Sequence, residues 1–487
     1  MHYSIEDFIE MWYLKLNFLL FAVCLSANSY GQSTAEKFSQ SRNLKGALIS
    51  VALADFETEA ILQSANKDQR LCPASVWKLF TTTAALKILG SEFRFRTVLA
   101  YDGKLENGIL SGNVYIIGGG DPSLGSRYFS PGFDGLMLQW ANAVKAAGID
   151  SINGKIVANA AHFQGDGIPG TRIWEDMGNY YGAAVSGLNI NDNTYFVDFK
   201  VPAELGEDAK ILSVEPAVPG LQIKSEVLSS SIQSDRAFIF GSPYTNERIV
   251  RGTLPAGRDH FKIKGSLPNP PVFAVSHLQK ALLKSGIGSG GLVVEQSTVR
   301  EPATYRVIHE SFSPPLSELV TRVNVESDNL YAESLLYQIG VKTGVGTLPG
   351  GLESLQKFFR PICEKEYPMY AYDGSGLSRF TAVSASQITS LIQYCAKDEM
   401  LRKDLLGTLP LAGVEGSMKW FGKRTNLDGN LRGKSGSMDK VRAYAGYFSA
   451  LSGRQIAFAV VVNNFDGSGA ELRQKIEEML LEVYGDY

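Results

Sequence analysis

The segment LCPASVWKLFTTTAALKILG, residues 71–90, places a lysine within an otherwise apolar run. Pro73 is a common helix start, and the alanine-rich turns that follow predict a helix that buries well. Ser75 and Lys78 are three residues apart, so their side chains share one face of that helix. Because burying an unpaired charge costs free energy, a chemical role explains a lysine at this position better than chance does. Burial lowers the pKa of an amine, and a neutral lysine can act as base for a neighbouring serine.

The Ser-x-x-Lys spacing occurs at four places, and the surrounding sequence separates them. The pairs are Ser64–Lys67, Ser75–Lys78, Ser354–Lys357 and Ser437–Lys440. A random pair of this kind is ordinarily a solvated lysine on a helix surface. Three of the pairs lie beside a charged turn, at an exposed-looking helix end or in a strand turn. Only Ser75 opens an apolar helix, so we expect it to be the nucleophile.

Acyl transfer also needs a proton path to the leaving group. The tripeptide Ser327-Asp328-Asn329 supplies a hydroxyl and an amide two residues apart, on one side of a tight turn. The same residues also predict the N-cap of the helix that follows. We expect Ser327 and Asn329 to belong to the site, with helix capping as the alternative.

A Lys-Ser/Thr-Gly element is the third requirement, since a cation there can bind a substrate carboxylate. It occurs at Lys284, Lys342 and Lys434. The first ends a helix, with Gly286 as its C′ residue, and the second closely follows a helix, which favours a loop. We expect the third, because its flanking glycines allow a substrate backbone to approach a strand.

Composition and other motifs exclude several classes of function. The net charge of −3 over 487 residues gives no electrostatic support for a nucleic-acid partner. The five histidines are scattered and no Cys-x-x-Cys occurs, so no metal site is expected. The run GIGSGG, residues 286–291, follows a helix and precedes a strand, the wrong order for a dinucleotide cofactor. No Gly-x-Ser-x-Gly elbow occurs, which argues against an α/β-hydrolase.

The N-terminus is typical of an exported protein. An apolar stretch at residues 16–25 is too short to span a bilayer and is followed by small residues at a cleavage site. We expect residues 1–31 to be a signal peptide, with Met11 as an alternative start. Beyond it, the spacing leaves a Cys363–Cys395 disulfide open.

The pattern of elements divides the chain into two similar ends and a different middle. Strand pairs at 46–66 and 441–464 accompany helical segments at the two ends. Residues 95–300 instead show many short strand-like runs separated by turn residues, with two interrupting helices at 133–148 and 275–286. We therefore expect one mixed α/β domain, split by a β-rich insertion.

Six segments, taken together and in order, resemble the DacB-type D-alanyl-D-alanine carboxypeptidases, peptidase family S13. They are PASVWKLFTTTAAL (73–86), GGGDPSL (118–124), ESDNLYAESLL (326–336), DGSGLSR (373–379), LPLAGVEGSM (409–418) and GKSGSM (433–438). The resemblance implies an α+β, β-lactamase/transpeptidase-like catalytic domain at 32–95 and 301–487, an antiparallel sheet flanked by helices. It also implies an inserted domain II at 96–182 and 272–300 and an inserted domain III at 183–271.

The resemblance implies a role for each catalytic side chain. Ser75 would attack the carbonyl of the terminal D-Ala-D-Ala bond and form an acyl-enzyme, with Lys78 as general base. Ser327 would relay the proton to the leaving D-alanine. Asn329 would hold Lys78 and the substrate amide.

The third motif would bind the substrate. Lys434 and Ser435 would hold the terminal carboxylate, with Gly436 between them and Ser437. Backbone N–H groups of Ser75 and Ser437 would form the oxyanion hole, and water would then deacylate the enzyme. Ser435 stands where threonine is commoner in the family, which preserves the hydroxyl.

Two further residues are candidates for binding the diamino acid of a stem peptide. Arg379 could bind its free carboxylate, since arginine suits bidentate recognition. Asp176, in the insertion, could meet the amine of the same side chain. A surface ion pair is the alternative for both. Cys72, three residues before the nucleophile, either packs apolarly or responds to oxidants.

The implied function is a serine-type DD-carboxypeptidase, and a DD-endopeptidase on cross-links, acting on peptidoglycan stem peptides in the periplasm or cell envelope. β-Lactams would be covalent inhibitors, weak membrane association is compatible, and no cofactor is needed. Two alternatives stay open: a β-lactam-hydrolysing enzyme or esterase, and a catalytically weak binding protein of the cell wall. The second is disfavoured because every catalytic position is filled.

Overall fold

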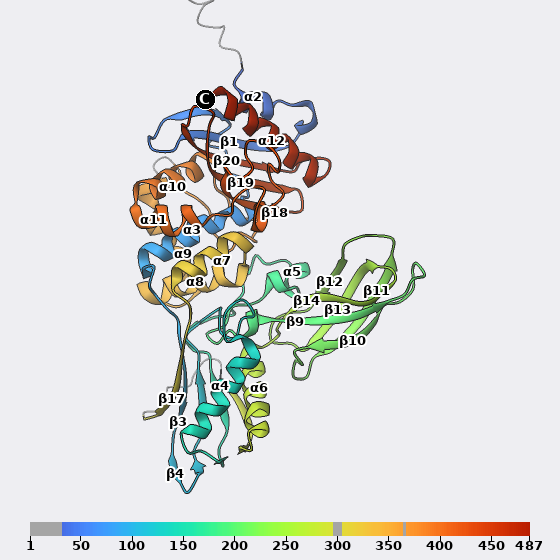
Figure 1. Cartoon of the computed structure of the whole chain (residues 1–487), viewed down its shortest axis with the longest axis vertical. Coiled ribbons are helices and arrows are strands. Elements are labelled where there is room, and N and C mark those ends of the chain that lie inside the picture. Colours follow the sequence, from blue (N-terminus) through green and yellow to red (C-terminus); the bar gives the residue numbers. More distant parts are fainter. Residues whose placement is uncertain (1–31, 296–303, 364–366) are drawn as a thin grey trace, which may run out of the picture.

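The computed structural model describes residues 32–295, 304–363 and 367–487. The expected signal peptide and the alternative start Met11 lie outside the described residues. Figure 1 shows three parts: an upper body (residues 32–95, 313–363 and 367–487), a lower arm (96–193, 267–295 and 304–312) and a lateral module (194–266). The arm and the module are thus inserted within the sequence of the upper body.

The upper body is built on an antiparallel sheet of order β18-β19-β20-β1-β2. Its strands are β1 (Leu48–Asp55), β2 (Ile61–Ala65), β18 (Arg432–Met438), β19 (Val441–Ser449) and β20 (Gln455–Asn463). Both faces of β20 are buried, because Ala459 and Val461 pack with one helical layer while Phe458 and Val460 pack with the other. The strand pairs predicted at 46–66 and 441–464 are confirmed.

Helices cover both faces of this sheet (Figure 1). α2 (Thr34–Ser39) and α12 (Gly469–Asp486) lie on one face. The other layer contains α3 (Lys78–Leu89), α7 (Leu316–Glu326), α8 (Asn329–Thr343), α9 (Leu348–Cys363), α10 (Ala385–Lys397) and α11 (Glu399–Asp404). Every residue from Lys78 to Leu86 is buried, which confirms the predicted apolar helix.

The lower arm contains a sheet of order β16-β8-β6-β3-β17 and two helices. These elements are β3 (Arg96–Tyr101), β6 (Val114–Ile117), β8 (Ile156–Asn159), β16 (Leu292–Glu295), β17 (Arg306–Phe312), α4 (Gly132–Ala146) and α6 (Pro270–Lys284). A smaller sheet contains β4 (Lys104–Glu106), β5 (Ile109–Ser111), β7 (Ser151–Ile152) and β15 (Gly288–Ser289). The two helices predicted between residues 95 and 300 are α4 and α6.

Strand β17 lies with the arm although the sequence predicts that the catalytic domain resumes at residue 301. It pairs antiparallel with β3, with Arg306 opposite Tyr101 and Phe312 opposite Arg96. The sheet of the arm therefore extends to Phe312. The division of the insertion into domains II and III otherwise stays a prediction.

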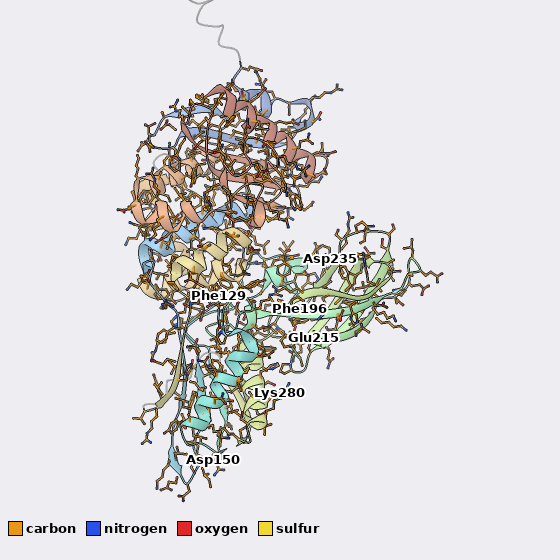
Figure 2. The ribbon with its side chains drawn as sticks, in the orientation of Figure 1. Phe129, Asp150, Phe196, Glu215, Asp235 and Lys280 are labelled. Atoms are coloured by element: carbon orange, nitrogen blue, oxygen red, sulfur yellow. The ribbon has the colours of Figure 1, made fainter. Side chains whose placement is uncertain are left out.

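The lateral module is formed by two small sheets, of order β10-β9-β14 and β11-β13-β12. Its strands are β9 (Thr194–Val201), β10 (Lys210–Glu215), β11 (Gln222–Ser230), β12 (Arg236–Phe240), β13 (Glu247–Pro255) and β14 (Arg258–Ser266). Figure 2 labels Phe196, near the start of β9, where the module joins the arm. One hydrophobic core runs through the arm and the module, which joins them into a continuous packed unit.

Short helical turns complete the described chain. They are η1 (Arg42–Leu44), η2 (Ala74–Trp77), α5 (Trp174–Met177), η3 (Tyr180–Gly182), η4 (Asn191–Asn193), η5 (Leu406–Thr408) and η6 (Gly416–Met418). The Cys363–Cys395 disulfide that the spacing left open is not formed, and both residues are buried thiols. Among the described helices, none is long and apolar enough to cross a membrane.

Candidate active site

Ser75 lies in the short turn η2, immediately before helix α3. The turn is fixed by Trp77, which is fully buried, stacks on Phe80 and donates from its indole nitrogen to the Asp373 carbonyl oxygen at 2.8 Å. Ala74 holds a positive φ of 45°, a conformation that alanine rarely adopts and that marks a constrained loop. These contacts fix the position of Ser75, which lines the cleft described below.

Lys78 is fully buried at the start of α3, and its ammonium nitrogen has three acceptors. Nζ donates to Ser75 Oγ at 2.9 Å, to Asn329 Oδ1 at 2.6 Å and to the Ser375 carbonyl oxygen at 2.7 Å. Burial lowers the pKa of Lys78 to about 8, against the opposing charges of Asp373 and Glu333. A lysine with that pKa reaches its neutral, proton-accepting form near neutral pH.

The Ser327-Asp328-Asn329 turn joins α7 to α8. Ser327 adopts the left-handed conformation, with φ of 62°, and ends α7. The N-cap of α8 is Asp328, which accepts from the backbone N–H of Tyr331. Asn329 donates from Nδ2 to the Tyr181 carbonyl oxygen at 2.8 Å, so its Oδ1 points to Lys78. Asp328 thus caps α8, and all three residues of the motif line the cleft.

Strand β18 brings Lys434 to the same place. This lysine is fully buried, and its Nζ donates to Ser327 Oγ at 2.9 Å and to the Ser435 carbonyl oxygen at 2.8 Å. Burial and the nearby Lys78 hold the pKa of Lys434 well below its ordinary value. By contrast, Lys342 is exposed near the end of α8, and Lys284 ends α6.

Gly436 serves a different purpose from the one that its sequence predicts. A Cβ at this position would overlap the Pro73 carbonyl oxygen and lie 3.0 Å from the backbone nitrogen of Ser75. The missing side chain therefore lets β18 approach the turn that carries Ser75. Close approach of two backbones, rather than of a substrate, accounts for this glycine. Beside it, Ser435 is half-buried and Ser437 is exposed.

Glu333 is a buried carboxylate that the sequence analysis does not predict, and it holds the loop whose Ser375 carbonyl oxygen accepts from Lys78. Glu333, on α8, pairs with Arg172 of the arm at 3.3 Å, and both side chains are almost wholly buried. It also accepts from the Gly374 and Ser375 backbone N–H groups at 2.9 and 3.2 Å and from Ser375 Oγ at 2.6 Å. The loop whose carbonyl oxygen holds Lys78 is thus fixed by Glu333. Its position one turn after Asn329 on the same helix face was the available sequence signal.

Ser75 lines a cleft of about 770 Å³ between the upper body and the inserted parts. Ser327, Asn329 and Ser437 line it, and so do both candidates for the diamino acid, Arg379 and Asp176. Arg379 is exposed and donates to the Asp439 carbonyl oxygen at 3.3 Å. Burial raises the pKa of Asp176, while the positive charges of Arg172 and Arg379 oppose the rise. Within the described chain, Arg379 and Asp176 form no direct ion pair with each other.

The comparisons with known proteins agree with one another. The family model for the D-Ala-D-Ala carboxypeptidase 3 (S13) family matches residues 32–483. The D-alanyl-D-alanine carboxypeptidase DacB of Haemophilus influenzae is 26% identical over 439 residues, which cover 88% of each protein. The D-alanyl-D-alanine carboxypeptidase of an Actinomadura species is 27% identical over 436 residues, covering 87% of this chain and 79% of the relative.

A solved structure shows the same arrangement of elements. The crystal structure of penicillin-binding protein 4 (dacB) from Haemophilus influenzae matches with a TM-score of 0.80 and 26% identity, over 92% of this chain and 99% of that one. A second structure of that protein, in complex with a β-lactam, matches with a TM-score of 0.75 and 25% identity, over 93% and 99% of the two chains. The catalytic domain is therefore of the β-lactamase/transpeptidase-like type. The chain belongs to the D-Ala-D-Ala carboxypeptidase 3 (S13) family and is a serine-type DD-carboxypeptidase, a hydrolase.

Proposed function

We propose that this enzyme hydrolyses the terminal D-Ala-D-Ala bond of peptidoglycan stem peptides through an acyl-enzyme on Ser75. The observation that carries the proposal is the hydrogen bond of 2.9 Å between Lys78 Nζ and Ser75 Oγ. The neutral amine of Lys78 accepts the proton of Ser75 as its oxygen attacks the substrate carbonyl. A pKa of about 8 makes that form available near neutral pH.

Departure of the leaving group requires a proton at its nitrogen. Ser327 is the candidate donor, since its hydroxyl accepts from Lys434 at 2.9 Å and can pass on its own proton. In this scheme the proton taken by Lys78 passes through Ser327 to the leaving D-alanine. Lys434, together with the Ser435 hydroxyl, binds the terminal carboxylate of the substrate. Asn329 orients Lys78, because its Oδ1 accepts a hydrogen bond from Lys78 Nζ at 2.6 Å.

Charge develops on the substrate oxygen during attack, and two backbone N–H groups are candidates to stabilise it. These belong to Ser75 and Ser437, which line the same cleft. One such donor is typically worth about 3–4 kcal/mol of barrier lowering. Water then attacks the acyl-enzyme and releases the trimmed stem.

The substrate proposed has a diamino acid whose free carboxylate meets Arg379 and whose amine meets Asp176. Both residues line the cleft with Ser75. Burial raises the pKa of Asp176, and a bound amine cation would stabilise its charged form. On a cross-link the same attack is endopeptidase action, which we propose as a second activity. We also propose export to the periplasm, on the N-terminal pattern of residues 1–31.

A labelled β-lactam separates this proposal from its alternatives. The DD-peptidase forms a stable adduct with the label and releases D-alanine from a pentapeptide, whereas a β-lactam-hydrolysing enzyme turns the label over. A catalytically weak binding protein labels poorly and releases no D-alanine. Rapid turnover of the label, or no peptide release by the wild type, contradicts the proposal.

A further inference from the structure

Three cations that the proposed mechanism does not use line the same cleft as Ser75 and Ser327. Arg322 lies on α7, Lys264 on β14 and Arg127 after β6, and all three line the cleft with Ser75. They come from the upper body, the lateral module and the arm. The site is therefore assembled only when the three parts pack together.

The carboxylates near these cations are already engaged. Arg322 pairs with Asp328 at 3.1 Å, and Asp328 also caps α8. Asp192 accepts from the Tyr331 hydroxyl at 3.2 Å and lies 4.0 Å from Arg127. Asp328 and Asp192 are thus the carboxylates nearest to the two arginines.

Lys264 is the cation without a carboxylate partner at ion-pairing distance among the described residues. Its ammonium lies 5.0 Å from the ring centre of Tyr180, a cation–π contact. Burial, with the repulsion of Arg127 and Arg322, lowers the pKa of Lys264 to about 8, and Asp192 and Asp328 only partly oppose this. Such a half-buried, uncompensated charge is stabilised by an anion that enters from the cleft.

Aromatic rings fix the two arginines in place. The guanidinium carbon of Arg322 lies 3.1 Å from the ring centre of Tyr128, and that of Arg127 lies 4.9 Å from the ring centre of Phe196. Phe196 is labelled in Figure 2, close to where the module meets the arm. Stacked guanidinium groups lose little freedom on binding a planar anion such as a carboxylate.

Arg322 and Arg379 contact different segments of the chain. Arg322 pairs with Asp328, directly after Ser327, whereas Arg379 donates to Asp439, two residues after Ser437. In the function proposed above, on which this inference rests, Ser327 is the residue that meets the leaving group. A ligand bound beside it lies on the leaving-group side of the cleaved bond.

A single stem ends at the leaving D-alanine, but a cross-linked substrate continues there into a second peptide stem. The cleft of about 770 Å³ has room for such a peptide, since sites of about 300–1,000 Å³ hold ligands well above dipeptide size. We propose that Arg127, Lys264 and Arg322 bind a free carboxylate of the second stem and thereby favour cross-link cleavage over trimming of single stems.

The test compares kcat/KM for a cross-linked dimer with kcat/KM for a single pentapeptide stem, using Lys264→Gln. The matched control is Lys262→Gln, on the same strand but exposed and paired with Glu215 at 2.7 Å. Loss of one charge-assisted hydrogen bond is expected to lower the dimer-to-pentapeptide ratio roughly tenfold in Lys264→Gln. The control keeps the wild-type ratio, and the rate of β-lactam acylation reports that each variant is folded.

A third substrate isolates the carboxylate: the same dimer with its second stem amidated at every carboxylate except the one on the leaving residue itself, which the proposed mechanism assigns to Lys434. The wild type should process this dimer with the lowered ratio of the variant, and Lys264→Gln should not distinguish it from the free-acid dimer. An unchanged ratio in Lys264→Gln, or equal loss on both natural substrates, overturns the inference. Wild-type enzyme that trims pentapeptide but leaves the dimer intact also overturns it, while the proposed carboxypeptidase stands. Failure on both substrates removes the proposed function itself.

Discussion

Replacing Glu333 by glutamine tests how its buried ion pair with Arg172 affects stability and the pKa of Lys78, the proposed base. Glu333 is enclosed by Arg172 at 3.3 Å, by the backbone N–H groups of Gly374 and Ser375, and by the Ser375 hydroxyl. Glutamine keeps the shape but has one acceptor oxygen and carries no charge. Its amide nitrogen must then face one of these donors, and Arg172 keeps a buried charge without a counter-ion.

The expected loss of stability follows from those contacts. Breaking a buried ion pair by neutralising one partner typically costs about 3–5 kcal/mol. The backbone N–H left without an acceptor alone accounts for about 1–3 kcal/mol of such a loss. Arg172 already has one guanidinium nitrogen, Nη1, without a hydrogen-bond partner, so losing the Glu333 carboxylate leaves its side chain with still fewer acceptors. We expect Glu333→Gln to lower the free energy of unfolding by about 3–5 kcal/mol.

The same change shifts the pH dependence of acylation. The charge of Glu333 raises the pKa of Lys78, whose net value, lowered by burial, is about 8. In the proposed mechanism Lys78 acts as a base in its neutral form, so the rate of acylation should rise with pH through that pKa. Removing the charge of Glu333 lowers the pKa of Lys78 further, and the rise must move to lower pH.

Two measurements check this prediction. Urea unfolding followed by tryptophan fluorescence gives stability, and Trp77 reports the loop directly through its hydrogen bond to Asp373. Stopped-flow acylation by a chromogenic β-lactam between pH 5 and 10 gives the pH profile, with Glu318→Gln in the first turn of α7 as a control. A stability change below about 1 kcal/mol, together with an unmoved acid limb, refutes the reasoning.

Three other predictions follow from single contacts. Gly436→Ala should slow β-lactam acylation about 100-fold, because its Cβ overlaps the Pro73 carbonyl oxygen and displaces Ser75, whereas Gly170→Ala, with open space around it, should leave the rate unchanged. Ser327→Ala should lower kcat for D-alanine release at least about 100-fold, a typical general acid–base contribution, and a smaller change contradicts its role. The Cys395 thiol, whose pKa burial raises to about 12, should resist iodoacetamide at pH 8 in the native enzyme and react in urea; mass spectrometry of the peptide checks this.

The sequence was sufficient for the elements whose signal is local. The strands of the central sheet carry runs of apolar residues, and the helix of Lys78 is buried from Lys78 to Leu86. The order of the three motifs also indicated the family and the antiparallel sheet flanked by helices. The glycines and the strand around Lys434, and the helix just before Lys342, favour Lys434, and Lys434 is the one that donates to Ser327.

Contacts between distant segments had no such signal. Arg172 and Glu333 are 161 residues apart, and neither lies in a pattern that predicts the other as its partner. The pairing of β17 with β3 likewise joins residues about 200 positions apart, so the boundary of the insertion was placed before β17 instead of after it. Local pattern predicts that a strand exists but not which strand it pairs with.

The central claim, that Ser75 is the nucleophile of a DD-peptidase, is tested most directly by mass spectrometry of muropeptides. Wild-type enzyme and Ser75→Ala are incubated with purified peptidoglycan fragments that contain pentapeptide stems and cross-linked dimers. The account predicts that wild type releases D-alanine and cleaves the dimers, and that Ser75→Ala leaves both unchanged. Wild-type enzyme that releases no D-alanine and cleaves no cross-link, or a Ser75→Ala variant that retains wild-type rates, contradicts it.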